Sequence, residues 1–282
     1  MQDARIDVDG VPAIDGLSLV TQGEHVLVLG APRAAFHAAT GVLAAVRGKI
    51  AIRGASPEVA VRDRLIAGCP LDPPLPPKWT PLEYITWSAR LSGHDKTTAK
   101  TNAARAVERI ELGAFATTPA ERLVPHAKRA TVLAAAMATG APVLAIEDPL
   151  ASLPEEIAHV WAGIFVAALS DRSWIVFAPR IPMTSPIVRA ADEAVVISHA
   201  HVDAQGPPLS VASASRRFVL RLHGALDVFV PRLQERGAQV RVSGAQVVVD
   251  LGQTLSTTEL LGISCDTNVT IVELHPVARA LA

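Results

Sequence analysis

Two adjacent carboxylates, Glu147 and Asp148, follow directly on the apolar run Pro142–Ile146. An aliphatic run of this length predicts a buried strand, so the two acids stand where that strand ends. In this position they could hold a metal ion. Such a pair is also typical of a solvated turn or of acids at a helix N-terminus, and the residues alone leave both interpretations open.

A second candidate for metal chemistry is the pair His199 and His201, with Asp203 close by. Strand spacing would put both imidazoles on one face, where they could bind a metal, whereas the alternative is the polar tip of a hairpin. Cys69 and Cys265 lie far apart without a C-x-x-C motif, so we expect reduced thiols and neither a disulfide nor a zinc site. No Ser-His-Asp or Cys-His grouping indicates nucleophilic catalysis, and on balance we expect no resident metal.

The overall charge argues against a nucleic-acid binder. The 282 residues carry 26 Lys and Arg against 27 Asp and Glu, a formal net charge of -1, so no bulk attraction to nucleic acid or anionic lipid is expected. Mean hydropathy is high at +0.31, yet no stretch approaches the roughly 18 uninterrupted apolar residues of a membrane span. The acidic N-terminus, without an apolar segment, does not indicate a signal peptide, so we expect a cytoplasmic protein.

Apolar runs and helical stretches alternate along residues 1–205. Short β-branched runs predict strands over 24–30, 48–53, 142–146, 174–178 and 194–198. Ala-rich composition or helical spacing predicts helices over 34–46, 81–91, 97–112, 155–169 and 187–191, and a loop followed by a buried helix within 119–138. Six prolines within 69–81 predict an irregular surface loop. Strands alternating with helices indicate an α/β fold with a mostly parallel, helix-covered sheet.

The pattern changes after the Gly206–Pro208 break. Shorter segments predict strands at 218–222, 239–242, 246–250 and 269–274, and helices at 228–236 and 254–261. This order is βαββαβ. We therefore expect a small α+β accessory domain over 217–282, joined to the first domain by a linker over 206–216.

Four segments, in order and spacing, resemble the nucleotide-binding subunit of an ABC transporter over roughly residues 3–205. They are Ala13–Leu19 with Gln22–Glu24, Leu29–Gly30, Thr80–Ile85 and Ile146–Leu153. The resemblance implies a P-loop NTPase-like ABC nucleotide-binding domain over 1–205, with a helical subdomain at about 79–140. The end of the chain, Val272–Val277, looks like the C-terminal domain of the export-type group that extrudes drugs and sodium.

The loop that would hold phosphate in this family is altered. A working P-loop follows G-x-x-x-x-G-K-[ST], in which backbone N–H groups surround the phosphates, Lys neutralises them and the hydroxyl holds magnesium. Here the loop begins at Gly30, but Ala35, Phe36 and His37 replace the second glycine, the lysine and the hydroxyl, and Arg33 is the cation that is left. The resemblance therefore implies a benzyl group where phosphate charge would lie and uncompensated phosphate oxygens if ATP bound in the usual pose.

The other nucleotide-contacting segments of the family are altered as well. The Q-loop glutamine aligns with Leu71, and in the D-loop Ser152 precedes Pro154, which replaces the aspartate. The Walker B acids are reversed, Glu147 before Asp148, so the second carboxylate falls about one methylene short. The signature segment, which in the family reaches the γ-phosphate across a dimer, aligns with residues that keep neither its hydroxyl nor its glycines: Leu123, Val124, Pro125, His126 and Ala127.

Two aromatic features of the family are also missing. No aromatic residue precedes Phe36, although the adenine-stacking residue would fall near Val8. No histidine for the switch position lies between Trp174 and Ile197. The basic segment His126–Arg129 is expected to be a solvated helix start.

These losses predict a pseudo-ATPase, which needs no cofactor and serves as a structural or regulatory subunit of an ABC transporter-like complex. Its expected partners are an integral membrane permease and/or a competent ABC ATPase paralogue, in a homo- or heterodimer. It would lie in the cytoplasm, peripheral on the inner face of the membrane. In the family, the permease's coupling helix docks beside the Q-loop, so Pro76, Pro77 and Trp79 are the contact candidates.

Two alternatives stay open. The first is a divergent ATPase that holds Mg-ATP through Gly30, Arg33 and Glu147 and hydrolyses it slowly with Asp148 as the base. The second is a scaffold protein unrelated to transport. Stabilisation of the chain by Mg-ATP would favour the first alternative, and failure to co-purify with a membrane protein would favour the second.

Overall fold

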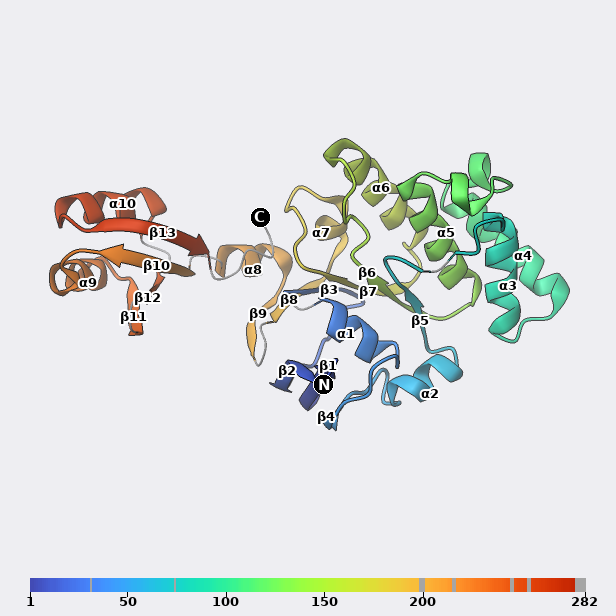
Figure 1. The fold of residues 1–282 in the computed structure, drawn as a ribbon, viewed down its shortest axis with the longest axis horizontal. Coiled ribbons are helices and arrows are strands. Elements are labelled where there is room, and N and C mark those ends of the chain that lie inside the picture. Colours follow the sequence, from blue (N-terminus) through green and yellow to red (C-terminus); the bar gives the residue numbers. More distant parts are fainter. Residues whose placement is uncertain are drawn as a thin grey trace. The chain divides into compact units, whose positions relative to one another are not determined.

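The computed structural model describes residues 1–30, 32–73, 75–197, 201–214, 217–243, 246–252 and 255–276. The chain forms two compact units, Met1–Pro208 and Leu209–Leu281, each of which is described by itself (Figure 1). Among the helices of these described residues, none is long and apolar enough to cross a membrane. The predicted linker, 206–216, contains helix α8, Pro208–Ala214.

A six-stranded sheet forms the centre of the first unit. Its order is β5-β6-β7-β3-β8-β9, and all strands are parallel except β9, which pairs antiparallel with β8. The strands span Ile66–Cys69 (β5), Val143–Glu147 (β6), Ser173–Ala178 (β7), His25–Leu29 (β3), Glu193–Ile197 (β8) and Val202–Gly206 (β9). The parallel sheet confirms the α/β prediction, and its buried strands explain the continuous apolar runs.

Helices cover both faces of this sheet. Figure 1 shows α1 (Pro32–Ala39) on one face and α5 (Pro125–Ala138), α6 (Glu155–Ala168) and α7 (Pro186–Ala190) on the other. Trp174 of β7 packs edge-on against Phe165 of α6, with ring centroids 5.8 Å apart. Phe177 faces α1 instead, because successive side chains of a strand point to opposite faces.

A three-stranded antiparallel sheet, in the order β2-β1-β4, covers the outer side of α1. Its strands are β1 (Gln2–Val8), β2 (Val11–Leu17) and β4 (Arg47–Lys49). The predicted strand over 48–53 is wrong in its bounds: the strand ends at Lys49, and Arg53 and Gly54 adopt left-handed conformations in a turn that Ile52 and Ala55 bridge. The predicted helix over 34–46 is also too long. It ends at Ala39, where the Thr40 hydroxyl bonds to the Phe36 carbonyl and Gly41 has a φ of +73°.

The helical subdomain consists of α3 (Pro81–Leu91), α4 (Lys96–Arg109) and α5, with 3-10 turns at Gly113–Phe115 and Ala120–Arg122. A capping box between Thr80 and Glu83 starts α3, and the Asp95 carboxylate caps α4. The part of α5 from Ala130 to Ala138 is buried throughout, as its alanines predict. The elements that escaped prediction include α2 (Pro57–Arg62), β1, β5, β9 and α8. Of these, α2 and β5 are too short for a periodic signal.

The second unit is a four-stranded antiparallel sheet with two helices. Its strands, in the order β11-β12-β10-β13, span Gln239–Ser243, Gln246–Asp250, Arg217–His223 and Thr270–Pro276. The helices are α9 (Leu226–Glu235) and α10 (Thr257–Asp266), and their buried faces share a core with the sheet that includes Leu220, Phe229 and Leu260. The order confirms the βαββαβ prediction.

Candidate functional site

Three predicted site residues lie at the carboxyl ends of parallel strands. Gly30 follows β3, Glu147 ends β6, and Leu71 comes two residues after β5. Ligands of open α/β sheets bind at this edge, so the fold brings together the residues predicted for the P-loop, Walker B and Q-loop positions.

The Glu147 side chain is buried, with 8% of its surface exposed, and it has two partners within the chain. Its Oε2 accepts a hydrogen bond of 3.1 Å from the Leu71 backbone N–H. Its Oε1 lies 3.7 Å from Nε of Arg33, a side chain that is 81% exposed. The carboxylate therefore links all three altered segments, and for Glu147 the interpretation as a solvated turn is wrong.

Gly30 is required by packing alone. Its φ is +104°, and a Cβ at this position would lie 2.1 Å from the Ile197 carbonyl oxygen of β8. No other residue fits so close to a neighbouring strand. The glycine of the altered P-loop thus has a structural reason that does not involve phosphate.

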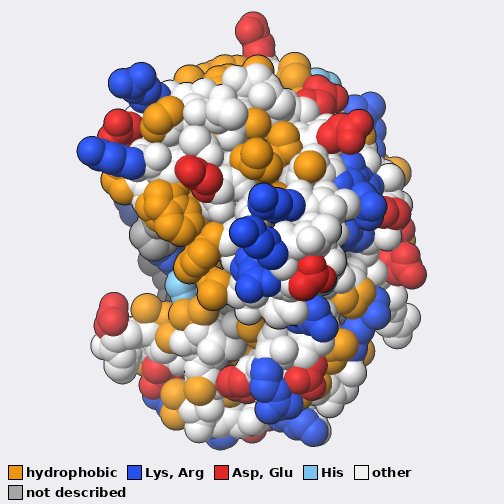
Figure 2. Space-filling view, turned by 90° about the vertical axis from the view of Figure 1, so that its right-hand side faces the viewer, with side chains coloured by type: hydrophobic (Ala, Val, Ile, Leu, Met, Phe, Trp, Pro, Cys, Tyr) orange, Lys and Arg blue, Asp and Glu red, His pale blue; other side chains and the backbone are white. Residues whose placement is uncertain are grey.

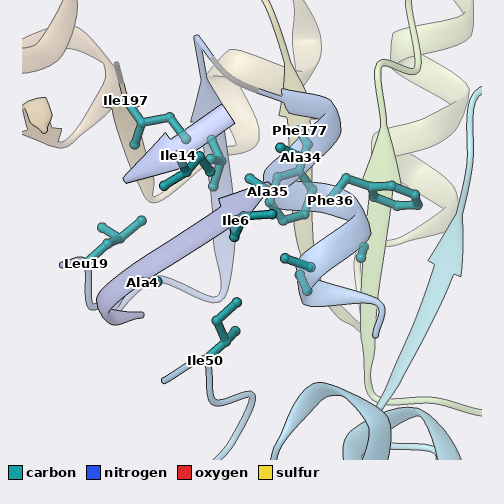
Figure 3. Packing of buried hydrophobic residues seen from close by; sticks show 14 of the residues in the cluster. Ala4, Ile6, Ile14, Leu19, Ala34, Ala35, Phe36, Ile50, Phe177 and Ile197 are labelled. Atoms are coloured by element: carbon teal, nitrogen blue, oxygen red, sulfur yellow. The ribbon is translucent and has the colours of Figure 1, made fainter. Parts of the chain in front are cut away.

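Phe36, at the position of the P-loop lysine, is a core residue with 3% of its surface exposed. Its ring contacts Phe177 edge-on, with centroids 5.9 Å apart, and the ring of His37 at 5.6 Å. Figure 3 shows Ala34, Ala35 and Phe36 of α1 in the same cluster as Phe177. The benzyl group expected at the phosphate position therefore packs in the core that α1 shares with the sheet.

Asp148 begins the loop after β6 in a left-handed conformation, with a φ of +37°. Its N–H donates to the Phe177 carbonyl over 2.7 Å, and its carboxylate receives no hydrogen bond from the described residues. Burial raises the pKa of Asp148; the Arg129 charge opposes this shift and the Glu147 charge adds to it. A half-buried carboxylate with a raised pKa is chemically suited to accept a proton.

Arg129 is a site residue that the sequence did not reveal. Its Nη1 donates to the Pro149 carbonyl over 3.1 Å, and Nε1 of Trp161 donates to the same oxygen over 3.1 Å. Burial lowers the pKa of Arg129, an effect that the Asp148 carboxylate opposes. The prediction that His126–Arg129 is solvated is therefore wrong for Arg129, which lies half-buried under the loop. No periodic signal marks it.

The signature-aligned residues stand at the start of α5, where Leu123 and Ala127 are buried and Val124 is the N-cap. Val124 has no side-chain oxygen, so no side chain caps this helix, and Pro125 follows at its first position. No hydrogen bond or ion pair among the described residues joins this segment to Arg33 or Glu147.

The D-loop residues lie beside a large hollow. Ser152 has a φ of +56° and Pro154 is the N-cap of α6. Ser152 and Asp148 both line a hollow of about 1180 Å³, and Arg180 and Pro182 also line it. The hollow thus lies between the D-loop and the segment that would carry the switch histidine.

The contact candidates Pro76, Pro77 and Trp79 lie on a fixed loop. The carbonyls of Pro77 and Trp79 accept hydrogen bonds of 2.9 and 2.8 Å from the backbone before α5. Trp79 packs edge-on against the partly exposed Trp87 of α3, with centroids 5.6 Å apart, and Tyr84 lies 6.0 Å from Trp87. We call Pro76, Pro77, Trp79, Tyr84 and Trp87 the aromatic surface. Figure 2 shows hydrophobic side chains exposed among charged ones on the face that carries α3 and α4.

Within the part of the chain that the structure describes, no group of three or more His, Cys, Asp or Glu side chains could hold a metal ion. His199 lies outside the described residues, so its predicted pairing with His201 stays a prediction. Cys69 is buried, which raises the pKa of its thiol to about 12, and Cys265 is exposed.

Comparison with solved structures shows which known fold this chain resembles. The chain superposes on cbiO1 from Clostridium perfringens, part of the ABC transporter complex cbiONQ, with a TM-score of 0.64 and 17% identity over 75% of this chain and 89% of that one. The fold is that of an ATP-binding cassette. The ADP conformation of the cassette MJ1267 gives a TM-score of 0.62 at 15% identity, covering 76% and 92% of the two chains. The dimeric post-hydrolysis cassette MJ0796, bound to ADP and Pi, gives 0.61 at 13%, covering 73% and 97%.

No protein-family model matches this sequence, and no curated protein matches it either. At identities this low the likeness shows the fold alone. The chemistry of this chain therefore depends on its own residues.

Proposed function

We propose that this cassette is a pseudo-ATPase, a structural or regulatory subunit of a membrane ABC transporter-like complex that works without nucleotide. One observation carries the proposal. The Glu147 carboxylate, at the position where the family holds magnesium, is buried and already satisfied by the Leu71 N–H and by Arg33. Magnesium would have to displace the contacts that join these segments.

The core position of Phe36 supports the same proposal. A lysine that reaches phosphate needs an open path from its backbone position, whereas Phe36 fills the core against Phe177. Arg33 is the remaining cation of the loop, and its contact is with Glu147. The site therefore offers ATP little charge compensation.

The aromatic surface supports a role in assembly. Trp79 and Trp87 are partly exposed large aromatic side chains on a fixed loop and helix, the kind of anchor that carries binding energy in protein interfaces. We propose that a helix of the membrane permease docks here. A competent ABC ATPase paralogue is the proposed second partner.

Thermal unfolding of the purified chain, with and without millimolar Mg-ATP, tests the proposal. A ligand at about 100 times its dissociation constant stabilises by about 2.7 kcal/mol, which for a protein of this size raises the midpoint by roughly 5 to 10 °C. We expect a cooperative transition that Mg-ATP does not shift. A shift of that size, lost in Arg33→Gln, would overturn the pseudo-ATPase proposal.

A divergent ATPase is the second candidate, and Asp148 is the observation that favours it. Its half-buried carboxylate with a raised pKa suits a general base, and it lines the hollow beside the D-loop. Steady-state phosphate release separates the candidates. We expect the wild-type chain to release no phosphate from ATP. Phosphate release that is abolished by Asp148→Asn would instead establish the ATPase.

Co-purification from membranes tests the partner. The chain should bring down an integral membrane protein, and the double variant Trp79→Ala/Trp87→Ala should lose it. Val160→Ala removes an exposed apolar side chain from α6, outside the aromatic surface, and should keep the partner. Equal recovery with all three chains would exclude the aromatic surface, and a chain that brings down no membrane protein would favour a scaffold unrelated to transport.

A further inference from the structure

A polar hollow of about 540 Å³ opens at the edge of the central sheet opposite to Glu147. It is bordered by His25 and Ser173, the first residues of β3 and β7, and by Pro142 just before β6. Arg53 and Arg172 also line it. The hollow therefore lies at the amino ends of the strands, away from the altered P-loop.

A smaller hollow of about 170 Å³ adjoins the first one. The two share Gly140 and Arg172 in their linings, and the smaller extends to Arg105 and Arg109 of α4. We call the combined space the arginine hollow. Four arginines from three separate segments of the first unit line it.

Structural contacts fix two of these arginines. Nη1 of Arg172 donates to the carbonyls of Met137 and Ala141, over 3.0 and 3.3 Å, and so satisfies the C-terminal end of α5. Arg109 forms a two-point ion pair with Asp171, with distances of 2.9 and 2.7 Å. These contacts hold both guanidiniums in place without any ligand.

The charges around the arginine hollow do not balance. Of the two carboxylates in the described lining, Asp171 is paired with Arg109. Glu24 is the other, and its single negative charge faces three arginines: Arg53, Arg105 and Arg172. Arg53 reaches the Ser173 hydroxyl at 3.5 Å, and none of the described residues gives Arg105 a hydrogen bond or an ion pair. A local positive excess thus stands in a chain whose net charge is -1.

One further carboxylate, Asp192, lies outside this lining and 3.6 Å from Nδ1 of His25, so the lining itself keeps its positive excess. His25 stacks on Trp174 with centroids 4.8 Å apart, and its Nε2 lies 3.1 Å from the Arg172 carbonyl oxygen. Burial lowers the pKa of Arg172; the Asp171 carboxylate opposes this shift and the Arg109 charge adds to it. An anion in the hollow would stabilise the charged form of this half-buried guanidinium.

We propose that the arginine hollow binds a phosphate group through Arg53, Arg105 and Arg172. A guanidinium presents a planar fork of N–H donors that matches two phosphate oxygens, and several such forks compensate the charge without a metal. The Ser170 and Ser173 hydroxyls in the lining are further donors. The phosphate belongs either to a free phosphorylated small molecule or to a lipid headgroup.

Isothermal titration of the full chain with inorganic phosphate and with pyrophosphate tests this site. We expect saturable binding that weakens by about tenfold for each arginine removed in Arg53→Gln and Arg105→Gln, because a charge-assisted hydrogen bond contributes about that much. Both side chains have little structural role, so the variants should melt like the wild type. Arg122→Gln removes the same charge from an exposed position outside the hollow and should bind normally.

Two further experiments determine where the phosphate binds and whether it belongs to a lipid headgroup. Arg33→Gln should leave binding unchanged, since Arg33 lies at the opposite edge of the sheet; loss of binding in that variant would place the anion at the altered P-loop and overturn the proposal. Sedimentation with vesicles of phosphatidylcholine, with and without phosphatidic acid, separates a lipid headgroup from a free phosphate. No binding of either form, or binding that is equal in the Arg53→Gln/Arg105→Gln variant, would also overturn it.

Discussion

The Leu71 backbone N–H donates a 3.1 Å hydrogen bond to the Glu147 carboxylate, which ties the proline-rich loop after β5 to the end of β6. The second carboxylate oxygen faces Arg33 at 3.7 Å. Solvent screens the ion pair because Arg33 is mostly exposed, whereas the hydrogen bond ends on a buried acceptor. The hydrogen bond is therefore the stronger link between the three altered segments.

Glu147→Ala should lower the free energy of unfolding by about 1–3 kcal/mol, because the Leu71 N–H loses its acceptor. Arg33→Gln should lower it by less than about 1 kcal/mol, since that ion pair is screened. Urea unfolding of the two variants measures both values. A larger loss for Arg33→Gln than for Glu147→Ala would show that the ion pair dominates.

Lysine at position 36, the residue that the resemblance implies there, should damage the protein. Phe36→Lys places an ammonium group among buried apolar side chains, so it should destabilise at least as much as Phe36→Ala, about 3–5 kcal/mol. Val42→Ala, at an exposed position close to α1, should change stability by less than about 0.5 kcal/mol. A Phe36→Lys variant that is as stable as the wild type, and whose midpoint of thermal unfolding rises with Mg-ATP, would contradict both this prediction and the pseudo-ATPase proposal.

Gly30→Ala should destabilise by about 2–6 kcal/mol, from an unfavourable backbone conformation together with a clash against the Ile197 carbonyl. Gly54→Ala is the matched control. Its φ of +85° is also left-handed, but no atom lies within 4 Å of the added methyl group, so about 1–2 kcal/mol is expected. Chemical unfolding measures the difference between the two variants. Equal losses in the free energy of unfolding would mean that β8 moves to make room for the methyl group.

Local signals made much of the fold predictable. Thr80 and Glu83 form a capping box three residues apart, and continuous apolar runs mark the buried strands of the sheet. The site depends instead on contacts between distant segments. Leu71 and Glu147 are 76 residues apart, and the buried position of Arg129 depends on a loop that follows α5 by ten residues or more. Such contacts have no periodicity that a single sequence could reveal.

Glu193 should make the first unit sensitive to acid. Burial tends to raise its pKa, but hydrogen bonds from the Gly23 N–H, the Gln205 side chain and the Gln22 N–H outweigh this and lower it. Since the folded pKa is below the unfolded value of about 4.3, the contribution is complete above that pH and is lost as pH falls through the folded pKa. Glu193→Gln should therefore flatten the loss of stability below about pH 5.

Urea midpoints of wild type and Glu193→Gln, measured at several pH values, check this slope. Glu83→Gln is the comparison, because that carboxylate also accepts local hydrogen bonds but is exposed at the start of α3. Parallel curves for wild type and Glu193→Gln would mean that Glu193 does not contribute to the acid sensitivity.

Asp148→Asn should stabilise the protein at neutral pH. The folded pKa of Asp148 is raised above the unfolded value of about 3.9, so its charged form opposes folding at higher pH, and this penalty disappears as pH falls towards the unfolded pKa. Asparagine keeps the shape of the side chain and tolerates the φ of +37°. The gain should therefore be present at pH 7 and vanish below about pH 4.

Asp9→Asn separates burial from backbone preference, because Asp9 has a φ of +51° and is exposed. Both variants replace Asp by Asn in a left-handed conformation, so a gain confined to Asp148→Asn, and only at higher pH, must come from the buried charge. Equal gains at both positions would contradict this origin. The same Asp148→Asn chain, shown to be folded and stabilised, then makes the ATPase test unambiguous, since any loss of phosphate release reflects the missing base rather than a damaged fold.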